Sequence, residues 1–413
     1  MKALKPRVVI TGIGIQSPLG WTGPEFFDRL CAGESGIRTH PDPAITFPVG
    51  WVDFDAHAHF SKMQLLNLDR VSQFGVVAAL DAVRNAGLNT EEALGEMTGV
   101  YFGTGAGGAE SSEHAYAKFF GADGEKKKLL TIPAAMIHAP ASQVALRLGV
   151  RGECQTYSTA CSSAAVAIGE AYRRIRDGYI KIAITGGADC VLMPGILDSW
   201  SAMRVLCIDP ADQGGESGTG CRPFSAERTG FAIGEGAAVL VLETWEAAQA
   251  RGIQILAEIV GYGVSNDASH LTKPNAAGQA MAMRSALTDA GLQPADIGYI
   301  NAHGTATHAG DRAETQSIKT VFKDHAYCIP ISATKSAHGH LMGATGAVEL
   351  VATVMALQQQ VVPPTSFYGK PDPECDLDYV PTKSRSVTDL NYALSNSFAF
   401  GGNNAALIVR RCE

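Results

Sequence analysis

Ser158-Thr-Ala-Cys161-Ser-Ser-Ala-Ala-Val-Ala-Ile-Gly-Glu-Ala-Tyr-Arg-Arg-Ile-Arg-Asp-Gly178 is a stretch in which a short polar segment leads directly into a helical pattern. After Cys161, apolar residues recur at three- and four-residue spacing, which is typical of an amphipathic helix. Arginines crowd the last turns and Gly178 follows them, as the helix dipole and the C-terminal stop signals favour. The stretch therefore predicts a cysteine at the start of a helix.

A cysteine in that position is a candidate nucleophile. Unpaired backbone N–H groups converge at a helix N-terminus together with the positive end of the dipole, and both favour a thiolate over a thiol. A buried structural cysteine is the alternative, and we expect that role for the other eight cysteines. We therefore expect Cys161 to be the nucleophile, in a position that favours its thiolate.

Length and composition indicate a compact enzyme of two units. The chain has 413 residues, of which 46% are hydrophobic and 18% charged, and 45 are glycine. Such a length predicts two units of similar size. The cysteines are odd in number and contain no Cys-x-x-Cys, so reduced thiols in a cytoplasm fit better than disulfides or a zinc ribbon.

Membranes and nucleic acids are not expected partners. The apolar run at residues 8–15 is interrupted by Gly12 and Gly14, and no stretch is long enough to span a bilayer. The net charge of −8 argues against general nucleic-acid binding.

The order of predicted elements repeats along the chain. In each half, a strand, a polar loop and a helix follow one another, and Cys161 in the first half stands where Lys335 stands in the second. We predict two α/β halves, residues 1–250 and 251–413, each with a mostly parallel sheet between helices. The predicted strands cover residues 7–15, 99–103, 180–187, 237–243, 255–260, 297–303 and 329–335, and the main helices cover 73–86, 245–252, 278–291 and 347–357.

A glycine cluster at residues 103–108 matches G-x-G-x-x-G, the pattern of a dinucleotide-binding turn. The acidic residue that should end a second strand about 20 residues later is absent. We therefore interpret the cluster as backbone packed close to an active-site cavity.

Four polar loops follow predicted strands and carry the chemistry. Ligand sites in α/β sheets lie beyond the carboxyl ends of strands, so these loops are expected to converge. A lone histidine is more often structural, which is the expectation for His308 and His338. The loops contain Cys161, residues 303–307 with His303, residues 335–340 with Lys335 and His340, and residues 396–402 with Phe400.

In this combination and order, the loops resemble those of the β-ketoacyl-acyl-carrier-protein synthases of type II fatty-acid and polyketide systems. The resemblance covers nearly the whole chain and implies a thiolase-like α/β fold, with two duplicated halves in a layered αβαβα arrangement. The matching stretches are Thr159-Ala-Cys161-Ser-Ser, Arg222-Pro-Phe, Gly230-Phe-Ala-Ile-Gly-Glu-Gly236, Asn301-Ala-His303-Gly-Thr-Ala-Thr307, Thr334-Lys335-Ser, Gly339-His340 and Asn396-Ser-Phe-Ala-Phe400-Gly-Gly402.

The resemblance implies a decarboxylative Claisen condensation. Cys161 would hold the acyl chain, with its own backbone N–H and that of Phe400 as the oxyanion hole. His303 and His340 would hydrogen-bond the malonyl thioester carbonyl and stabilise the enolate as carbon dioxide leaves. Lys335 would support the site electrostatically with Glu314 as partner. No metal or redox cofactor is expected, because the phosphopantetheine arrives on the acyl carrier protein.

Further residues take their expected roles from the same resemblance. Phe231 and Phe400 match gating aromatics, and Thr305 and Thr307 match positions that contact the pantetheine arm. Departures from the family pattern occur at Ser225 and Thr229, where aspartates are usual, and in the acyl pocket. The pocket departures are Ala106, Trp200 and Asp198, whose carboxylate is unexpected beside an alkyl chain; they hint at a polyene or aryl-primed chain, or at ordinary drift on a loop.

Carrier proteins are acidic, so a basic rim should steer them to the entrance. Residues 64–68 lack the charges usual in the family. The candidate docking residues are Lys62, Arg70, Lys126, Lys127, Lys128 and Arg204.

Three functional hypotheses follow. The leading one is a chain-elongating ketosynthase of fatty-acid type. The second is a specialised type II polyketide or aryl-polyene ketosynthase that works with a different partner subunit. The third is a non-catalytic chain-length partner, which the presence of Cys161, His303 and His340 opposes. The family also implies a homodimer or a heterodimer with a related subunit, with residues 129–151 near the interface.

Overall fold

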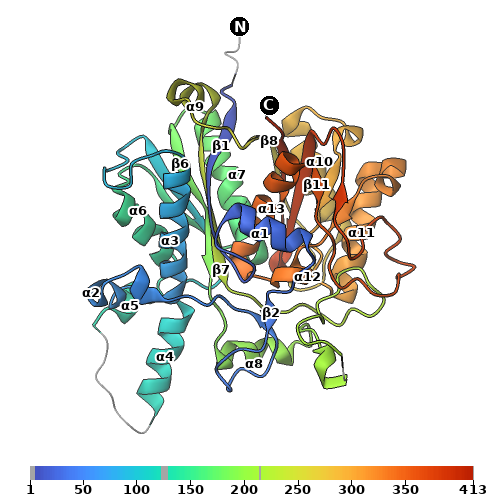
Figure 1. The fold of residues 1–413 in the computed structure, drawn as a ribbon, viewed down its shortest axis with the longest axis horizontal. Helices are drawn as coiled ribbons and strands as arrows, with labels where there is room; N and C mark the ends of the chain where they lie inside the picture. The colour runs from blue at the N-terminus through green and yellow to red at the C-terminus, as the bar shows by residue number, and fades with distance from the viewer. Residues whose placement is uncertain (1–4, 122–128, 214, 413) are drawn as a thin grey trace.

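The computed structural model of the protein describes residues 5–121, 129–213 and 215–412. A ten-stranded sheet runs through it (Figure 1). In spatial order its strands are β10 (Ile331–Ser332), β9 (Tyr299–Asn301), β13 (Tyr392–Phe398), β14 (Asn403–Arg410), β8 (Ala257–Asn266), β1 (Val8–Gln16), β7 (Gly236–Thr244), β6 (Ile182–Asp189), β4 (Thr98–Gly103) and β5 (Cys154–Tyr157).

The two halves of this sheet have the same topology. From β1 outward, β1–β7 and β7–β6 are antiparallel, whereas β6–β4 and β4–β5 are parallel. From β8 outward, the order β8–β14–β13–β9–β10 shows the same sequence of two antiparallel and two parallel pairings. The antiparallel pair β1–β8 joins the halves. The predicted duplication is thus confirmed.

The prediction of mostly parallel sheets was wrong, because half of the pairings within each half are antiparallel. Strands buried on both faces have apolar residues throughout, so their pattern does not record their direction. β1 is an example, since all nine of its residues are buried.

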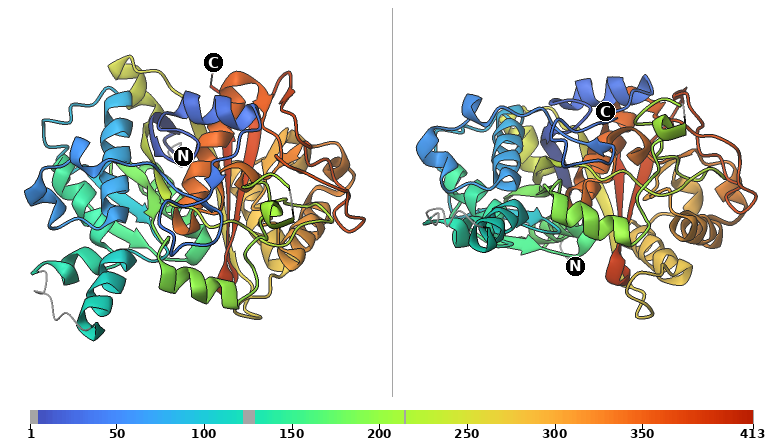
Figure 2. Two further views of the ribbon diagram at one scale, coloured as in Figure 1. Left: turned by 60° about the horizontal axis from the view of Figure 1, so that its bottom comes forward. Right: turned by 90° about the horizontal axis from the view of Figure 1, so that it is seen from below.

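Helices form three layers around the sheet, which gives the αβαβα arrangement (Figures 1 and 2). The central layer contains α7 (Ser163–Arg176) and α13 (Thr345–Gln359), which pack on each other and on the inner faces of the two halves. The outer layers are α3 (Arg70–Asn85) with α6 (Ala139–Leu148), and α10 (Ala276–Ala290) with α11 (His308–Phe322).

Two glycines explain how α3 lies so close to β1. A Cβ at Gly12 would lie 2.1 Å from the carbonyl oxygen of Ala82, and one at Gly14 would lie 2.0 Å from that of Ala78. Glycine inside a strand often marks such a close approach of another backbone. The same glycines that interrupt the apolar run in the sequence therefore allow the outer layer to pack.

The long helices begin and end within about three residues of their predicted bounds. α3 begins earlier than predicted because Asp69 caps it, and α10 begins after the cap Asn275. Lys335, predicted as the end of a strand, begins the short helix α12 (Lys335–His338). None of the helices in the described ranges is long and apolar enough to cross a membrane.

Smaller elements lie around the layers, and α4 projects away from them (Figure 2). They are α1 (Gly23–Cys31), α2 (Lys62–Leu65), α4 (Ala109–Phe120), α5 (Thr131–Ala135), α8 (Pro194–Ala202) and α9 (Trp245–Arg251), with the ribbons β2 (Ile37–Arg38)–β3 (Val49–Gly50) and β11 (Val361–Val362)–β12 (Arg385–Ser386).

Candidate active site

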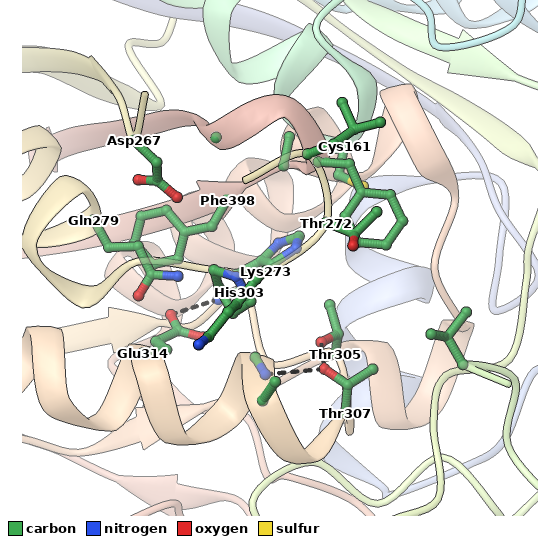
Figure 3. Close-up of a pocket in the computed structure, with 18 of the residues that line it drawn as sticks. Cys161, Asp267, Thr272, Lys273, Gln279, His303, Thr305, Thr307, Glu314 and Phe398 are labelled. Carbon is green, nitrogen blue, oxygen red and sulfur yellow. Dashed lines mark hydrogen bonds between the residues drawn. The ribbon is translucent and has the colours of Figure 1, made fainter. Parts of the chain in front are cut away.

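Cys161, His303 and His340 converge at the ends of strands from both halves. Cys161 follows β5, His303 follows β9, and His340 follows β10 and α12. The Cys161 sulfur and one ring nitrogen of each histidine all lie within 4.8 Å of one another. All three line a cavity of about 220 Å³ (Figure 3). The predicted convergence of the polar loops is therefore present.

Cys161 sits in a tight turn before α7. Ala160 has a left-handed backbone with φ of 50°, a conformation that costs free energy for a residue other than glycine. Two side-chain hydrogen bonds stabilise the turn: the Thr159 N–H donates to Ser163 Oγ at 2.9 Å, and Ser163 Oγ donates to the Ala160 carbonyl at 2.6 Å. The turn places the thiol beside its own N–H and that of Phe400.

Burial raises the pKa of the Cys161 thiol to about 11, although Lys335 and the two backbone N–H groups act in the opposite direction. The expectation of a resting thiolate is therefore corrected. Loss of solvation in the cavity outweighs the favourable helix end, because burial disfavours the charged form. Burial therefore favours the thiol over the thiolate in the resting site.

The tautomer of His340 follows from its hydrogen bonds. The Met342 N–H donates to Nδ1 at 3.1 Å, so Nδ1 is an acceptor and the ring hydrogen is on Nε2. Thr345 Oγ1 lies 2.9 Å from the same nitrogen. Burial and the charge of Lys335 hold the pKa of His340 well below 6.5, so the ring is neutral.

His303 has the same tautomer for a different reason. The Lys335 ammonium, which only donates hydrogen bonds, lies 3.3 Å from its Nδ1. Burial, Lys335 and His340 hold the pKa of His303 well below 6.5. The two rings meet edge to face at 5.6 Å. The site thus contains two neutral imidazoles with Nε2–H donors, which suits a substrate oxygen that develops negative charge.

Lys335 pairs with Glu349 and not with Glu314, which corrects the prediction. Lys335 Nζ lies 2.6 Å from Glu349 Oε1, and neither side chain is exposed. Glu314 instead accepts the backbone N–H groups of His303 and Gly304, both at 2.8 Å. Glu314 therefore fixes the His303 loop. Glu349 was missed, although an acidic residue within the apolar run of residues 347–357 was a signal for a buried partner.

Three aromatic side chains extend from the histidines along the cavity. The ring of Phe231 lies 5.2 Å from that of His340, and Trp200 lies 5.8 Å from Phe231. Trp200 stacks on Phe400 at 6.0 Å. The predicted gating aromatics and the predicted pocket residue Trp200 thus form one contiguous wall.

Other predicted pocket residues divide into two groups. Thr305 and Thr307 line the cavity, and their hydroxyls lie 2.9 Å apart. Ala106 is not one of the lining residues; like Trp200, it packs against the buried cluster that contains Phe231. Asp198 is exposed and lies outside the lining, because two residues along α8 turn a side chain away from the face that Trp200 occupies. The structure therefore does not place the Asp198 carboxylate in the cavity.

The candidate docking residues differ in whether their charge is exposed to an approaching carrier protein. Lys62 and Arg204 are exposed, and Arg204 lies between Met203 and Val205, which line the cavity. Arg70 is held by Glu235 through contacts of 2.9 and 2.6 Å, so its charge is already compensated. Lys126, Lys127 and Lys128 lie outside the described residues.

Part of the lining comes from a segment that the sequence analysis did not single out. Residues 267 and 270–274, between β8 and α10, border the cavity. Asp267 secures this segment by accepting the Asn275 N–H at 3.1 Å and Asn404 Nδ2 at 2.7 Å. Lys273 places an exposed cation there. The segment has no motif, and its position after a strand is the one signal that could have identified it.

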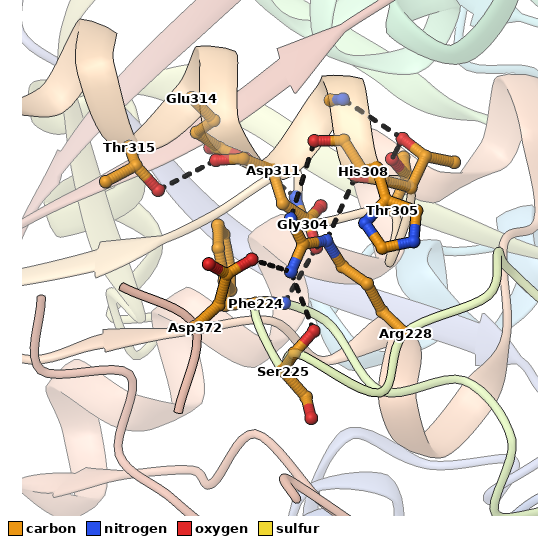
Figure 4. A network of polar contacts seen from close by, with 12 residues as sticks. Phe224, Ser225, Arg228, Gly304, Thr305, His308, Asp311, Glu314, Thr315 and Asp372 are labelled. Atoms are coloured by element: carbon orange, nitrogen blue, oxygen red, sulfur yellow. Dashed lines mark hydrogen bonds and ion pairs between the residues drawn. The ribbon is translucent and has the colours of Figure 1, made fainter. Parts of the chain in front are cut away.

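A buried arginine secures the Thr307 loop from behind (Figure 4). Arg228 is fully buried, and its Nη1 lies 2.6 Å from Asp372 Oδ2. The same nitrogen donates to the Ser225 carbonyl at 2.7 Å, and Nε donates to the Thr307 carbonyl at 3.4 Å. Ser225 is one of the positions where the sequence resemblance implied an aspartate. Here Asp372 and the more distant Asp311, 3.5 Å from Nε, provide the negative charge.

A cysteine beside two neutral histidines, at the strand ends of a duplicated αβαβα fold, defines a thiolase-fold condensing enzyme. The N-terminal domain of β-ketoacyl synthases matches residues 5–248, and the C-terminal domain of the same family matches residues 256–368. The chain belongs to the β-ketoacyl synthase family and is a ketosynthase, an acyltransferase.

Three similar proteins illustrate the range of this family. Nodulation protein E of Rhizobium meliloti (strain 1021) is 42% identical over 98% of this chain and 99% of its own. The 3-oxoacyl-[acyl-carrier-protein] synthase 2 of Staphylococcus aureus (strain COL) is 38% identical over the same shares. The solved structure of the ishigamide ketosynthase/chain length factor aligns with a TM-score of 0.91 and 33% identity over 99% of this chain and 100% of its own.

Proposed function

We propose that the protein condenses an acyl chain held on Cys161 with a malonyl group on an acyl carrier protein, which yields a β-ketoacyl carrier protein. The observation that carries this proposal is the convergence of Cys161, His303 and His340 within 4.8 Å. The name of the Staphylococcus relative supports the fatty-acid type of elongation.

The first step transfers the acyl chain. Cys161 Sγ attacks the carbonyl carbon of an acyl thioester, and the bond to the pantetheine sulfur breaks. The proton of the Cys161 thiol leaves with that sulfur as the carrier thiol. The backbone N–H groups of Cys161 and Phe400 bind the oxyanion that forms in between.

The second step breaks the bond between the malonyl carboxylate and the methylene carbon. Carbon dioxide leaves, and the electron pair moves into the thioester as an enolate. The Nε2–H groups of His303 and His340 donate to the enolate oxygen. Because both rings are neutral, each donor stabilises the charge without losing its proton.

The third step joins the chains. The enolate carbon attacks the acyl carbonyl on Cys161, and the carbon–sulfur bond to Cys161 breaks as the β-ketoacyl thioester leaves. One proton from solvent restores the thiol. No electrons are transferred to an outside acceptor, so we propose that the protein needs no cofactor beyond the phosphopantetheine of the carrier.

The carrier would dock at the mouth of the cavity. Thr305 and Thr307 offer hydroxyls along the entrance, and Lys273 adds a cation there. Lys62 and Arg204 are exposed and supply positive charge for an acidic carrier.

We further propose a dimer with an identical or a related subunit. Strand β5 lies at the edge of the sheet, and Leu129, Ile132 and Leu146 are 93%, 67% and 76% exposed. Exposed apolar side chains and an unpaired strand edge are each typical of an interface. The ishigamide protein, a ketosynthase/chain length factor, supports a related subunit as an alternative to a second copy.

A specialised ketosynthase is the second candidate. The observation that favours it is Trp200, which narrows the cavity beside Phe231 and Phe400. A flat or unsaturated chain would stack on these rings better than a saturated chain. For either candidate we propose a cytoplasmic enzyme, since all nine cysteines are unpaired.

The proposed function is tested by reconstituting the condensation. Purified protein is given an acyl-carrier and a malonyl-carrier thioester, and both carbon dioxide and the β-ketoacyl product are measured. A panel of saturated, polyene and aryl acyl groups decides between the two candidates. Absence of product with every acyl donor, both alone and with a candidate partner subunit, would overturn the proposal.

A further inference from the structure

Asp189 is a buried carboxylate at the end of β6 whose hydrogen-bond donors are all uncharged. Its side chain is fully buried. It accepts the backbone N–H groups of Gly105 at 2.7 Å, Ala106 at 3.1 Å and Gly343 at 2.6 Å, together with the Thr104 hydroxyl at 3.1 Å. A buried carboxylate is costly unless such donors satisfy it, so a specific role explains its presence better than packing alone.

Two glycines are required for this arrangement. A Cβ on Gly343 would lie 2.3 Å from the Gly105 nitrogen and 2.7 Å from Asp189 Oδ2. A Cβ on Gly105 would lie 2.9 Å from the same oxygen. The absence of side chains lets backbone from both halves of the protein reach one carboxylate. This explains Gly105 in the glycine cluster at residues 103–108, which resembled a dinucleotide-binding turn.

The residue before Gly343 contacts one of the two histidines of the site. Gly343 follows Met342, whose N–H donates to Nδ1 of His340 at 3.1 Å. Met342 has a left-handed backbone with φ of 44°, which is strained for a side chain of its size. Strain of this kind persists only where neighbouring contacts hold the segment, and Asp189 provides one such contact on the adjacent residue.

We propose that Asp189 is a positioning residue that keeps His340 in its Nε2–H tautomer by holding residues 342 and 343 in place. This inference rests on the proposed roles of the two histidines in decarboxylation. While Met342 donates to Nδ1, the ring can present hydrogen only from Nε2. If the turn relaxes, Nδ1 can take the hydrogen, and Nε2 can no longer donate to the enolate oxygen.

Replacing Asp189 by asparagine tests the link with almost no change in size. The amide of Asp189→Asn points an NH₂ group at one pair of donors, either Gly105 with Gly343 or Ala106 with Thr104. Because a neutral amide oxygen is a weaker acceptor than a carboxylate, the Gly343 contact is weakened in either orientation. We expect decarboxylation to fall about tenfold to hundredfold, the order of effect of a weakened oxyanion donor. Transfer of the acyl group to Cys161 uses other donors and should stay within about threefold.

Thr185→Val is the matched control. Thr185 lies on β6 with Asp189, is buried, and its hydroxyl has no hydrogen-bond partner among the described residues. The two half-reactions are measured separately, as carbon dioxide release from malonyl-carrier protein and as acyl transfer to Cys161. Selective loss of decarboxylation in Asp189→Asn supports the proposal. Equal loss of both half-reactions, or no loss, overturns it.

The tautomer can also be read without a variant. Nitrogen NMR on protein labelled at histidine distinguishes a protonated from an unprotonated Nδ1. We expect an unprotonated Nδ1 on His340 in the wild type and a mixture in Asp189→Asn, with His303 unchanged. A protonated Nδ1 in the wild type would overturn the inference. If the wild type itself releases no carbon dioxide, the proposed function fails; if it does and the variant matches it, only the role of Asp189 fails.

Discussion

Lys335 and Glu349 form an ion pair with an Nζ–Oε1 distance of 2.6 Å, and neither side chain is exposed. The pair lies directly behind His303, whose Nδ1 is 3.3 Å from the same ammonium. Burying two charges is costly, so the pair serves to position Lys335 more than to stabilise the fold. The pair holds the Lys335 ammonium next to His303. There the ammonium fixes the tautomer of His303 and keeps its ring neutral.

Breaking the pair should destabilise the protein strongly. Glu349→Gln leaves the Lys335 ammonium buried without its carboxylate, and we expect the free energy of unfolding to fall by about 3–5 kcal/mol in urea titrations. The exposed pair Arg29–Glu34, at 2.7 Å, supplies the control, since Glu34→Gln should cost less than about 1 kcal/mol. Equal effects of the two substitutions would contradict this account of the buried pair.

Cys161 should react faster as the pH rises. Because burial raises its pKa to about 11, the thiolate fraction grows about tenfold per pH unit between pH 7 and pH 9. Iodoacetamide modification, mapped to Cys161 by peptide mass spectrometry, should follow that slope. Cys154 and Cys328 are exposed, which corrects the prediction that all the other cysteines are buried, and they are internal references for the reagent. A rate for Cys161 that is already constant at pH 7 would show that its thiolate is the resting form.

Substitution of the histidines should separate the half-reactions. His303→Ala and His340→Ala each remove one donor to the enolate oxygen, so we expect carbon dioxide release to fall about 10²–10³-fold. Acyl transfer should fall much less, because its oxyanion is bound by backbone N–H groups. His308→Ala, at an exposed position, is the control. Retention of decarboxylation in both histidine variants would contradict the proposed roles.

The Arg228–Asp372 pair should affect substrate binding more than chemistry. Asp372→Asn weakens the hold on Arg228, which donates to the Thr307 carbonyl at 3.4 Å. We expect KM for pantetheine thioesters to rise severalfold with kcat nearly unchanged, as for a loss of uniform binding. Steady-state kinetics with Glu374→Gln, at an exposed carboxylate on the same loop, provide the comparison. A fall in kcat with constant KM would place Asp372 in the chemical step.

Much of this site was predictable from local sequence patterns. The helical spacing after Cys161 predicted α7, and the polar loops after predicted strands identified both histidines and Lys335. The repeated order of elements predicted the duplication that the strand pairings confirm. These features depend on residues near one another in the chain, where periodicity and capping act directly.

The remaining features depend on contacts between distant segments. Glu349 lies 14 residues from Lys335 on another helix, and Asp189 lies 154 residues from Gly343. The thiol state of Cys161 depends on how completely the surrounding loops exclude water. The orientation of Asp198 depends on which face of α8 meets the cavity. None of these leaves a periodic pattern, so the structure was needed to find them.

The central claim is that Cys161 carries the acyl chain, and intact-mass measurement tests it most directly. Wild-type protein and Cys161→Ala are incubated with a panel of acyl-carrier thioesters, and the intact mass of each protein is measured. The account predicts one acyl adduct on the wild type and none on the variant. An adduct of equal yield on Cys161→Ala would contradict it.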